Sequence, residues 1–309
     1  MALVQAENTV KIEGILSEVD VNNITFKKKD ASGVSHDTEA LSGVIKVRVE
    51  GVKIGGVEKT LEVPVHVFAS KFKNNGQANP AYENIDTCVQ KFKSIAAVGY
   101  DEADAVRITG ASITMNEFYP QGSETLVSQP RISASFITKI TDKSQMKPEA
   151  SFAATFVVAN GAYEVDADGV ETGRYKITGI LPQYGGKVDK VTFVAVDQGV
   201  ITAVSSYWQP NETVKAVGKL NFSSTTIKEM VEVDFGEPQE RIRTVSVSEL
   251  VITGGAQTPL TGEQAYDIDE INEALAQRKA ALLARKAASE TQAPKAPAQG
   301  KATISNLGF

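Results

Sequence analysis

The sequence predicts a mainly β protein with two tandem small β-barrels, a C-terminal α-helix and a flexible tail. Three observations predict this architecture. Alternating runs rich in β-branched residues recur from residue 9 to residue 253. Glycines stand inside several of these runs, where a strand bulges or bends sharply, as at the corner of a small barrel. A charged, alanine-rich stretch near the C-terminus has the period of a helix instead.

A recurring phrase divides the strands into two modules. Residues 11–16 read KIEGIL and residues 176–181 read KITGIL, and shorter echoes are RITG at 107–110 and KAVG at 215–218. Each half of the chain holds the phrase twice. We therefore expect two copies of one β module, each with a glycine-marked bend in an early strand and again in a late one.

The first module covers residues 1–145 and contains one helix between strands. Apolar residues at Ile85, Val89 and Phe92 form a helical stripe, which predicts a helix over 82–98. A polar, glycine-bearing stretch at 30–43 predicts a loop. The alternating runs predict strands at 9–19, 24–29, 44–52, 59–72, 105–120 and 131–140.

The second module covers residues 146–258, because the polar, proline-bearing segment 141–151 reads as a boundary. Tight turns and short strands with little helix are typical of a barrel or a sandwich. The expected strands are 152–165, 173–185, 187–196, 199–208, 212–222 and 243–253.

Residues 259–288 form a connector and a helix, expected over 267–288. Acidic residues fill its first turn and Arg285 and Lys286 its last, which suits the helix dipole. Residues 289–309 read as a flexible linker that ends in a small apolar tip.

Composition narrows the functional classes. The net charge of −6 is unfavourable for nucleic-acid binding. Net charge is a sum over the whole chain, however, and basic residues can still line one part of the surface. The single cysteine, Cys88, fits a reducing compartment. No apolar run approaches the ~20 residues of a membrane span, and the N-terminus lacks the pattern of a signal peptide. We therefore expect a cytoplasmic protein that does not contact a membrane.

No motif predicts catalysis, a metal site or a cofactor. The two histidines, His36 and His66, have no cysteine or carboxylate neighbours that would complete a zinc site. The turn at 166–169 resembles a calcium loop but lacks the distal glutamate, so a plain β-turn is expected. A nuclease would need carboxylates around magnesium, and the acidic segment 229–240 reads as a loop. We expect a protein that is not an enzyme.

Aromatic and basic residues stand side by side on the predicted strands. Single-stranded nucleic acid is bound by such pairs, because bases stack on rings while Lys and Arg follow the phosphates. Phenylalanines on strands usually belong to the core, which we expect for Phe68, Phe92, Phe136, Phe156 and Phe193. The candidate binding residues are Phe26, Lys27, Lys28, Lys29, Lys71, Phe72, Lys73, Phe118, Tyr119, Arg131, Tyr184, Lys187, Lys190, Tyr207, Trp208 and Lys219. For Tyr119, Tyr184, Tyr207 and Trp208, which lie next to turns, burial and exposure both stay open.

The first module resembles the oligonucleotide-binding (OB) barrel. Its helix precedes a strand with the sequence VRITG at 106–110 and then NEFY at 116–119, similar to the late strands of single-stranded DNA-binding proteins. KITGILPQYG at 176–185 and TVKAVGKL at 213–220 follow the same plan in the second module. The whole chain resembles a bacteriophage-type single-stranded DNA-binding protein with tandem OB barrels and a tail.

This resemblance implies a DNA path along 26–29, 68–73, 118–119 and 184–190, in the host cytoplasm if the protein is phage-encoded. It also implies that Leu307 and Phe309 at the C-terminal tip dock replication or recombination proteins, although the tip lacks the family's acidity. The expected function is to bind and protect single-stranded DNA during replication or recombination, with little sequence preference. The alternative is a phage virion or assembly protein built from β-barrels, which we would favour if the aromatic residues were buried.

Overall fold

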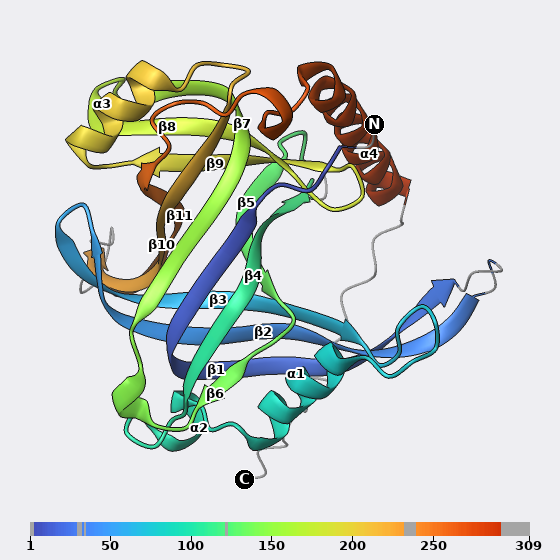
Figure 1. Ribbon diagram of the computed structural model, residues 1–309. Coiled ribbons are helices and arrows are strands. Elements are labelled where there is room, and N and C mark those ends of the chain that lie inside the picture. The colour runs from blue at the N-terminus through green and yellow to red at the C-terminus, as the bar shows by residue number, and fades with distance from the viewer. Residues whose placement is uncertain (1–2, 30–32, 34, 121–122, 232–238, 292–309) are drawn as a thin grey trace, which may run out of the picture.

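Strands dominate the computed structural model, which describes residues 3–29, 33, 35–120, 123–231 and 239–291. Within these residues, eleven strands pair into one continuous sheet that closes on itself twice. Helices α3 (Gln198–Tyr207) and α4 (Ile268–Thr291) lie at one end of the molecule, and α1 (Pro80–Lys91) and α2 (Ile95–Val98) at the other (Figure 1). Residues 289–291 of the predicted tail belong to the last helix, and residues 292–309, which include Leu307 and Phe309, lie outside the described residues.

The first closure is a five-stranded barrel in the order β1-β2-β3-β5-β4, with β4 pairing back onto β1. Strands β3 and β5 are parallel and the other pairs of the ring are antiparallel. This order, with helix between β3 and β4, is that of an OB barrel. The elements are β1 (Asn8–Lys29), β2 (Ser35–Ile54), β3 (Val57–Ser70), α1 (Pro80–Lys91), α2 (Ile95–Val98), β4 (Ala105–Phe118) and β5 (Val127–Ala134).

The second closure repeats this order as β7-β8-β9-β11-β10, with β10 pairing back onto β7 and α3 between β9 and β10. The predicted fold class, two tandem OB-like barrels followed by a helix, is thereby confirmed, while the boundaries at 145 and 258 stay predictions. The elements are β6 (Thr138–Ile140), η1 (Lys143–Gln145), β7 (Glu149–Val165), β8 (Glu171–Pro182), β9 (Val188–Ala195), α3 (Gln198–Tyr207), β10 (Thr213–Val231), β11 (Gln239–Gly255), η2 (Gly262–Gln264) and α4 (Ile268–Thr291).

The first strands of the two barrels join them. β1 and β7 pair antiparallel, with Val10 opposite Phe152, and they cross the middle of the molecule together (Figure 1). Apolar residues of both barrels form one buried cluster, in which the rings of Phe156 and Phe193 stack with centroids 4.5 Å apart. The core assignment of these two rings is therefore confirmed. The barrels share a core and a sheet, so their outer faces are held in a fixed relation.

Residues 198–207, expected as part of a strand, form the helix α3 instead. The Asp197 side chain caps it by accepting from the backbone N–H of Gly199. Its apolar residues Ile201 and Val204 have the spacing of a helix face and are buried. Rich β-branched composition favoured a strand, but burial of this face against the second barrel determines the structure.

Other predicted boundaries also shift. β1 runs unbroken through the expected gap at 20–23, and β2 begins inside the expected loop at 30–43, so the two strands form a long hairpin. The helix predicted over 82–98 is interrupted between α1 and α2. The ends of β1 and β2 extend outward from the barrel (Figure 1).

The glycines of the repeated phrase lie inside strands, as expected. The two longest copies of the phrase, at 11–16 and 176–181, do not lie on equivalent strands. Gly110 is the bulged residue that the β1–β4 register skips, with a φ of +80° that suits glycine. Gly14, however, lies on the first strand of its barrel and Gly179 on the second strand of the other. The two phrases therefore lie on early strands of the two barrels, as expected, but not on equivalent ones.

A buried carboxylate holds the junction of the barrels, and its protonation in acid should lower the stability of the protein. Glu13 on β1 accepts from Arg107 Nε at 2.6 Å and from the backbone N–H of Lys147 at 2.6 Å. The hydrogen bond from Arg107 lowers the pKa of Glu13 below its ordinary 4.5. The stability from this group is therefore present above about pH 4.5 and disappears as the pH falls through the lowered pKa.

We expect Glu13→Gln to reduce the free energy of unfolding by about 1–2 kcal/mol at pH 7, since Arg107 is half exposed and screened by solvent. Urea titrations at pH 7 and pH 3 measure this. The difference between the variant and the wild-type protein should shrink at pH 3. An equal difference at both pH values would contradict a role for the ionised carboxylate.

Candidate nucleic-acid interface

The outer face of the first barrel carries an open groove across β2, β3, β5 and β4. Alternation on β3 turns Val65 and Val67 into the core and His66 and Phe68 outward. The groove has a volume of about 540 Å³. Its lining includes Ser42, Val44, His66, Phe68, Gly110, Ser112, Arg131 and Ser133. This is the face, and these are the strands, through which OB barrels bind oligomers.

Two aromatic rings stand at one end of the groove. Phe68, expected in the core, is 54% exposed, and the ring of Phe26 on β1 lies 5.6 Å from it, centroid to centroid, tilted by 60°. Phe136 is exposed as well, so its core assignment is also wrong. Both rings of the pair belong to the outer face, because Phe26 and Phe68 share the side-chain direction of Ser42 on the strand between them.

A basic side chain, Arg131, lines the groove. The Nε atom of Arg131, on β5, is buried and has no hydrogen-bond partner among the residues that the structure describes. His66 lies on the neighbouring strand, opposite Ser133. Burial lowers the pKa of His66, and the charge of Arg131 lowers it further. The groove therefore offers positive charge and hydroxyl groups together.

A second hollow continues along the hairpin of β1 and β2. Its lining includes Lys28, Thr38, Phe72 and Lys73, and Lys28 Nζ donates to the carbonyl oxygen of Phe72 at 3.3 Å. Thr38 lies opposite Phe26, four positions along β2 from Ser42, which is roughly 13 Å at strand spacing. The groove, the ring pair and this hollow therefore follow one another along one face.

Lys71 also lines the second hollow, but its charge is already paired. Its Nζ lies 2.6 Å from Glu39 Oε2, and that hydrogen bond raises the pKa of Lys71. Asp37 adds another carboxylate to the lining. The net positive charge of this hollow therefore depends on Lys28 and Lys73.

The equivalent face of the second barrel is covered. The turn between β2 and β3 reaches across to it: Val52 and Ile54 are buried, and a side chain at Gly55 would lie 3.2 Å from Val196 Cγ2. Lys59 Nζ donates to Asn221 Oδ1 at 3.3 Å, although 162 positions separate the two residues. The first barrel thus packs its own hairpin against the strands β9 and β10 of the second.

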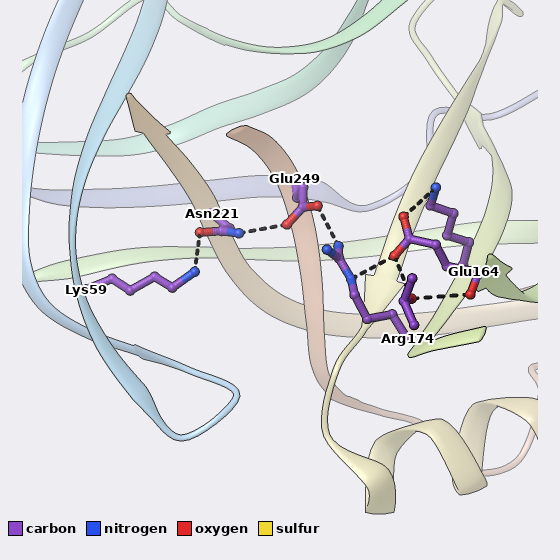
Figure 2. A network of polar contacts seen from close by, with 7 residues as sticks. Lys59, Glu164, Arg174, Asn221 and Glu249 are labelled. Carbon is purple, nitrogen blue, oxygen red and sulfur yellow. Dashed lines mark hydrogen bonds and ion pairs between the residues drawn. The ribbon is translucent and has the colours of Figure 1, made fainter. Parts of the chain in front are cut away.

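A network of hydrogen bonds and ion pairs also occupies this face of the second barrel (Figure 2). Asn221 Nδ2 donates to Glu249 Oε2 at 2.7 Å, and Glu249 Oε1 accepts from Arg174 Nη2 at 2.5 Å. Arg174 Nε lies 3.0 Å from Glu164, which also pairs with Lys176 at 2.8 Å. The hydrogen bond from Lys176 lowers the pKa of Glu164. Arg174 and Lys176 on this face are therefore neutralised by carboxylates, whereas Arg131 forms no ion pair with the described residues.

Several predicted binding residues lie elsewhere. Trp208 is only 7% exposed: its ring meets Phe156 edge-on and its Nε1–H donates to the carbonyl oxygen of Ala256 at 2.9 Å. Its assignment as a stacking residue is therefore wrong, because both its apolar ring and its polar atom are satisfied inside the fold. Tyr207, at the end of α3, is exposed but distant in sequence and topology from the groove strands. Lys219 on β10 is half-buried.

The predicted residues near α4 have an acidic setting. Tyr184 is 84% exposed and lines a hollow with Glu270 and Glu273 of α4. The nearby Lys187 and Lys190 are exposed. These lysines lie on the second barrel and not on the groove of the first.

The β4–β5 hairpin is engaged by α4. Phe118 is exposed, whereas Tyr119 is half-buried with Lys286 Nζ 5.5 Å from its ring centroid. Two ion pairs hold the helix there, Arg278 with Glu117 and Lys286 with Glu124. The ring of Tyr119 is thus partly covered by the chain itself.

Two of the three clustered lysines can be placed. Lys28 shares its strand face with Phe26, and Lys27 points to the opposite face. The side chain of Lys29 lies outside the described residues. The structure therefore brings together Phe26, Lys28, Phe72, Lys73 and Arg131 from the predicted set, and adds His66 and Phe68.

Other kinds of site are not formed by the part of the chain that the structure describes. No three His, Cys, Asp or Glu side chains gather there as metal ligands. No helix in that part has the length and apolar character to span a membrane. Cys88 is buried, which raises the pKa of its thiol to about 12.

Comparison with known proteins gives one family and several similar solved structures. No curated protein matches the chain. The single-stranded DNA binding protein from Thermus aquaticus is similar with a TM-score of 0.47 and 9% identity, over 86% of this chain and 99% of that chain. A deletion mutant of it gives a TM-score of 0.45 and 9% identity, over 84% and 97%. The family model of YorF matches residues 6–289, most of the length, and the chain therefore belongs to the YorF family.

Proposed function

We propose that the protein binds single-stranded DNA on the outer face of its first barrel and protects it during replication or recombination, without catalysing a reaction. One observation carries the proposal. The Phe26–Phe68 ring pair and Arg131, whose buried Nε has no hydrogen-bond partner among the described residues, lie on one open face, next to the hollow with Lys28 and Lys73.

The chemistry of this face suits a single strand better than a duplex. Bases stack on exposed rings only when they are free of a partner strand, and each base contributes ~1–3 kcal/mol. Arg131, Lys28 and Lys73 supply charge for the phosphates. The lining has few groups arranged to read base edges, so we expect little sequence preference. We expect one short strand per chain, because the face of the second barrel is covered by the β2–β3 turn.

The proposal predicts preferential, salt-sensitive binding of oligo-dT. In fluorescence anisotropy, a labelled dT oligomer should bind more tightly than a duplex of equal length, since only the free strand offers bases for stacking. About three phosphate contacts should give a slope of log affinity against log salt of roughly −2. Calorimetry with a decamer should give one oligomer per chain.

Lys190→Ala is the matched control, because Lys190 is an exposed lysine on the second barrel. It should leave affinity within about twofold, whereas Lys73→Ala should weaken binding and flatten the salt slope by about one. Equal affinity for duplex and single strand, or no binding at low salt, would contradict the proposal and favour an assembly role.

A further inference from the structure

The groove of the first barrel contains a guanidinium with a buried nitrogen that the described residues leave without a hydrogen bond. The buried Nε of Arg131 makes no hydrogen bond among the described residues. The carboxylates on neighbouring outer positions are engaged elsewhere, Glu62 by the hydroxyl of Ser17 at 2.7 Å and Glu18 by Lys46 at 2.6 Å. Buried polar groups normally have partners, and a charged one is costly without them. An anion from outside the chain would satisfy it.

Small donors surround the guanidinium. Ser133 lies two positions along β5, His66 lies opposite Ser133 on β3, and Ser112 lies opposite it on β4. Ser42 stands one strand further on β2. A guanidinium, hydroxyl groups and an imidazole are the donors that suit phosphate oxygens. No carboxylate lines this groove.

We propose that these side chains form a phosphate subsite in which Arg131 and His66 hold one phosphodiester of the bound strand. The inference rests on the proposed function and specifies how that site is built. Phe68 lies two positions from His66 on the same strand face, roughly 7 Å along β3. A base stacked on Phe68 therefore brings a phosphate of the same strand within reach of His66 and Arg131.

The subsite couples binding to protonation of His66. Burial and the neighbouring Arg131 keep the pKa of His66 below its ordinary 6.5, so the imidazole is neutral at pH 7 in the free protein. Its outer-face neighbours on β2, Ser42 and Val44, carry no charge, and Arg131 is the charged group that faces it from β5. A phosphate favours the imidazolium, so binding takes up a proton and tightens as the pH falls from 8 to 6.

Calorimetry with a dT decamer at pH 6.5 in two buffers of different ionisation enthalpy measures this proton uptake. The wild-type protein should take up a fraction of a proton, and His66→Gln should take up none. Arg131→Met should weaken binding about tenfold or more and flatten the salt slope by about one, and Lys190→Met should change neither. Arg131→Lys, which keeps charge but loses the planar fork, should recover only part of the affinity.

A scan with single neutral methylphosphonate linkages tests the subsite first in the wild-type protein and then, for comparison, in Arg131→Met. One linkage should weaken binding to the wild type and have no effect on Arg131→Met. If dT binds but no linkage behaves this way and no proton is taken up, the subsite is wrong while the proposed function stands. If pyrophosphate binds in an Arg131-dependent way and dT does not bind, the phosphate subsite stands, but single-stranded DNA is not the molecule that supplies its phosphate.

Discussion

A Phe68→Ala variant should bind oligo-dT about ten- to a hundredfold more weakly than the wild-type protein while remaining folded. The ring is 54% exposed at the end of the groove, and each base that stacks on such a ring contributes ~1–3 kcal/mol. Its removal also takes away the partner of Phe26. Fluorescence anisotropy with labelled dT measures the affinity, and thermal unfolding measured by circular dichroism checks the fold.

Tyr207→Ala is the control for this variant. Tyr207 has a similarly exposed ring on α3, outside the groove, so its removal should leave affinity unchanged. Because both rings are exposed, neither substitution should change the free energy of unfolding by more than about 1 kcal/mol. Equal losses of affinity in the two variants, or no loss in Phe68→Ala, would mean that the groove is not where bases stack.

Gly218→Ala should be among the most destabilising single substitutions in the chain, at about 3 kcal/mol. The new Cβ would lie 2.2 Å from the carbonyl oxygen of Val251 and 2.4 Å from Phe152 Cζ. The first atom is backbone of the paired strand, and the second belongs to a ring packed in the core. Neither can move without disturbing the closure of the second barrel and its junction with β1.

Urea unfolding of Gly218→Ala and Gly254→Ala gives the comparison. Gly254 lies on the facing strand, and a Cβ there would meet Val217 Cγ2 at an ordinary 3.5 Å. We expect less than about 1 kcal/mol for Gly254→Ala. If the two variants were equally stable, the close approach of β10 and β11 at Gly218 would be wrong.

The barrels could be predicted from the sequence because their strands and bends depend on residues that are close together in the chain. Alternation placed the strands, glycine marked the bulge at Gly110, and acidic residues in its first turn marked the start of α4, which runs three residues past its predicted end. The outward position of Phe68 was also available from the sequence. In the run VPVHVFAS at 63–70, the valines alternate with Pro64, His66 and Phe68, so one face takes the valines and the other takes the ring.

The exposure of individual rings depended on contacts that no local pattern contains. Trp208 follows a β-branched run beside a turn. Its ring is nevertheless buried, because its N–H donates to the carbonyl oxygen of Ala256, 48 positions away. The ion pairs between α4 and the β4–β5 hairpin join residues 161 and 162 positions apart, which is how Tyr119 becomes partly covered. Tertiary packing of this kind can bury or expose the same residue type.

The unequal faces of the two barrels were beyond sequence reasoning for the same reason. Both barrels have the same strand order, so a repeat predicts two similar binding faces. The difference comes from the length and curvature of the β2–β3 hairpin, which brings Lys59 to Asn221 in the other barrel. The chain therefore uses one copy of the fold as an open surface and the other as support for it.

Photo-crosslinking with dT oligomers that carry 5-iododeoxyuridine, followed by mass spectrometry, tests most directly where the strand lies. Crosslinks form to aromatic side chains that stack on the modified base. We predict adducts on Phe68 and Phe26, lost when excess unlabelled dT competes, with none on Tyr163 or Tyr184. Adducts confined to rings of the second barrel, with Phe26 and Phe68 unmodified, would contradict the assignment of the first barrel as the DNA-binding surface.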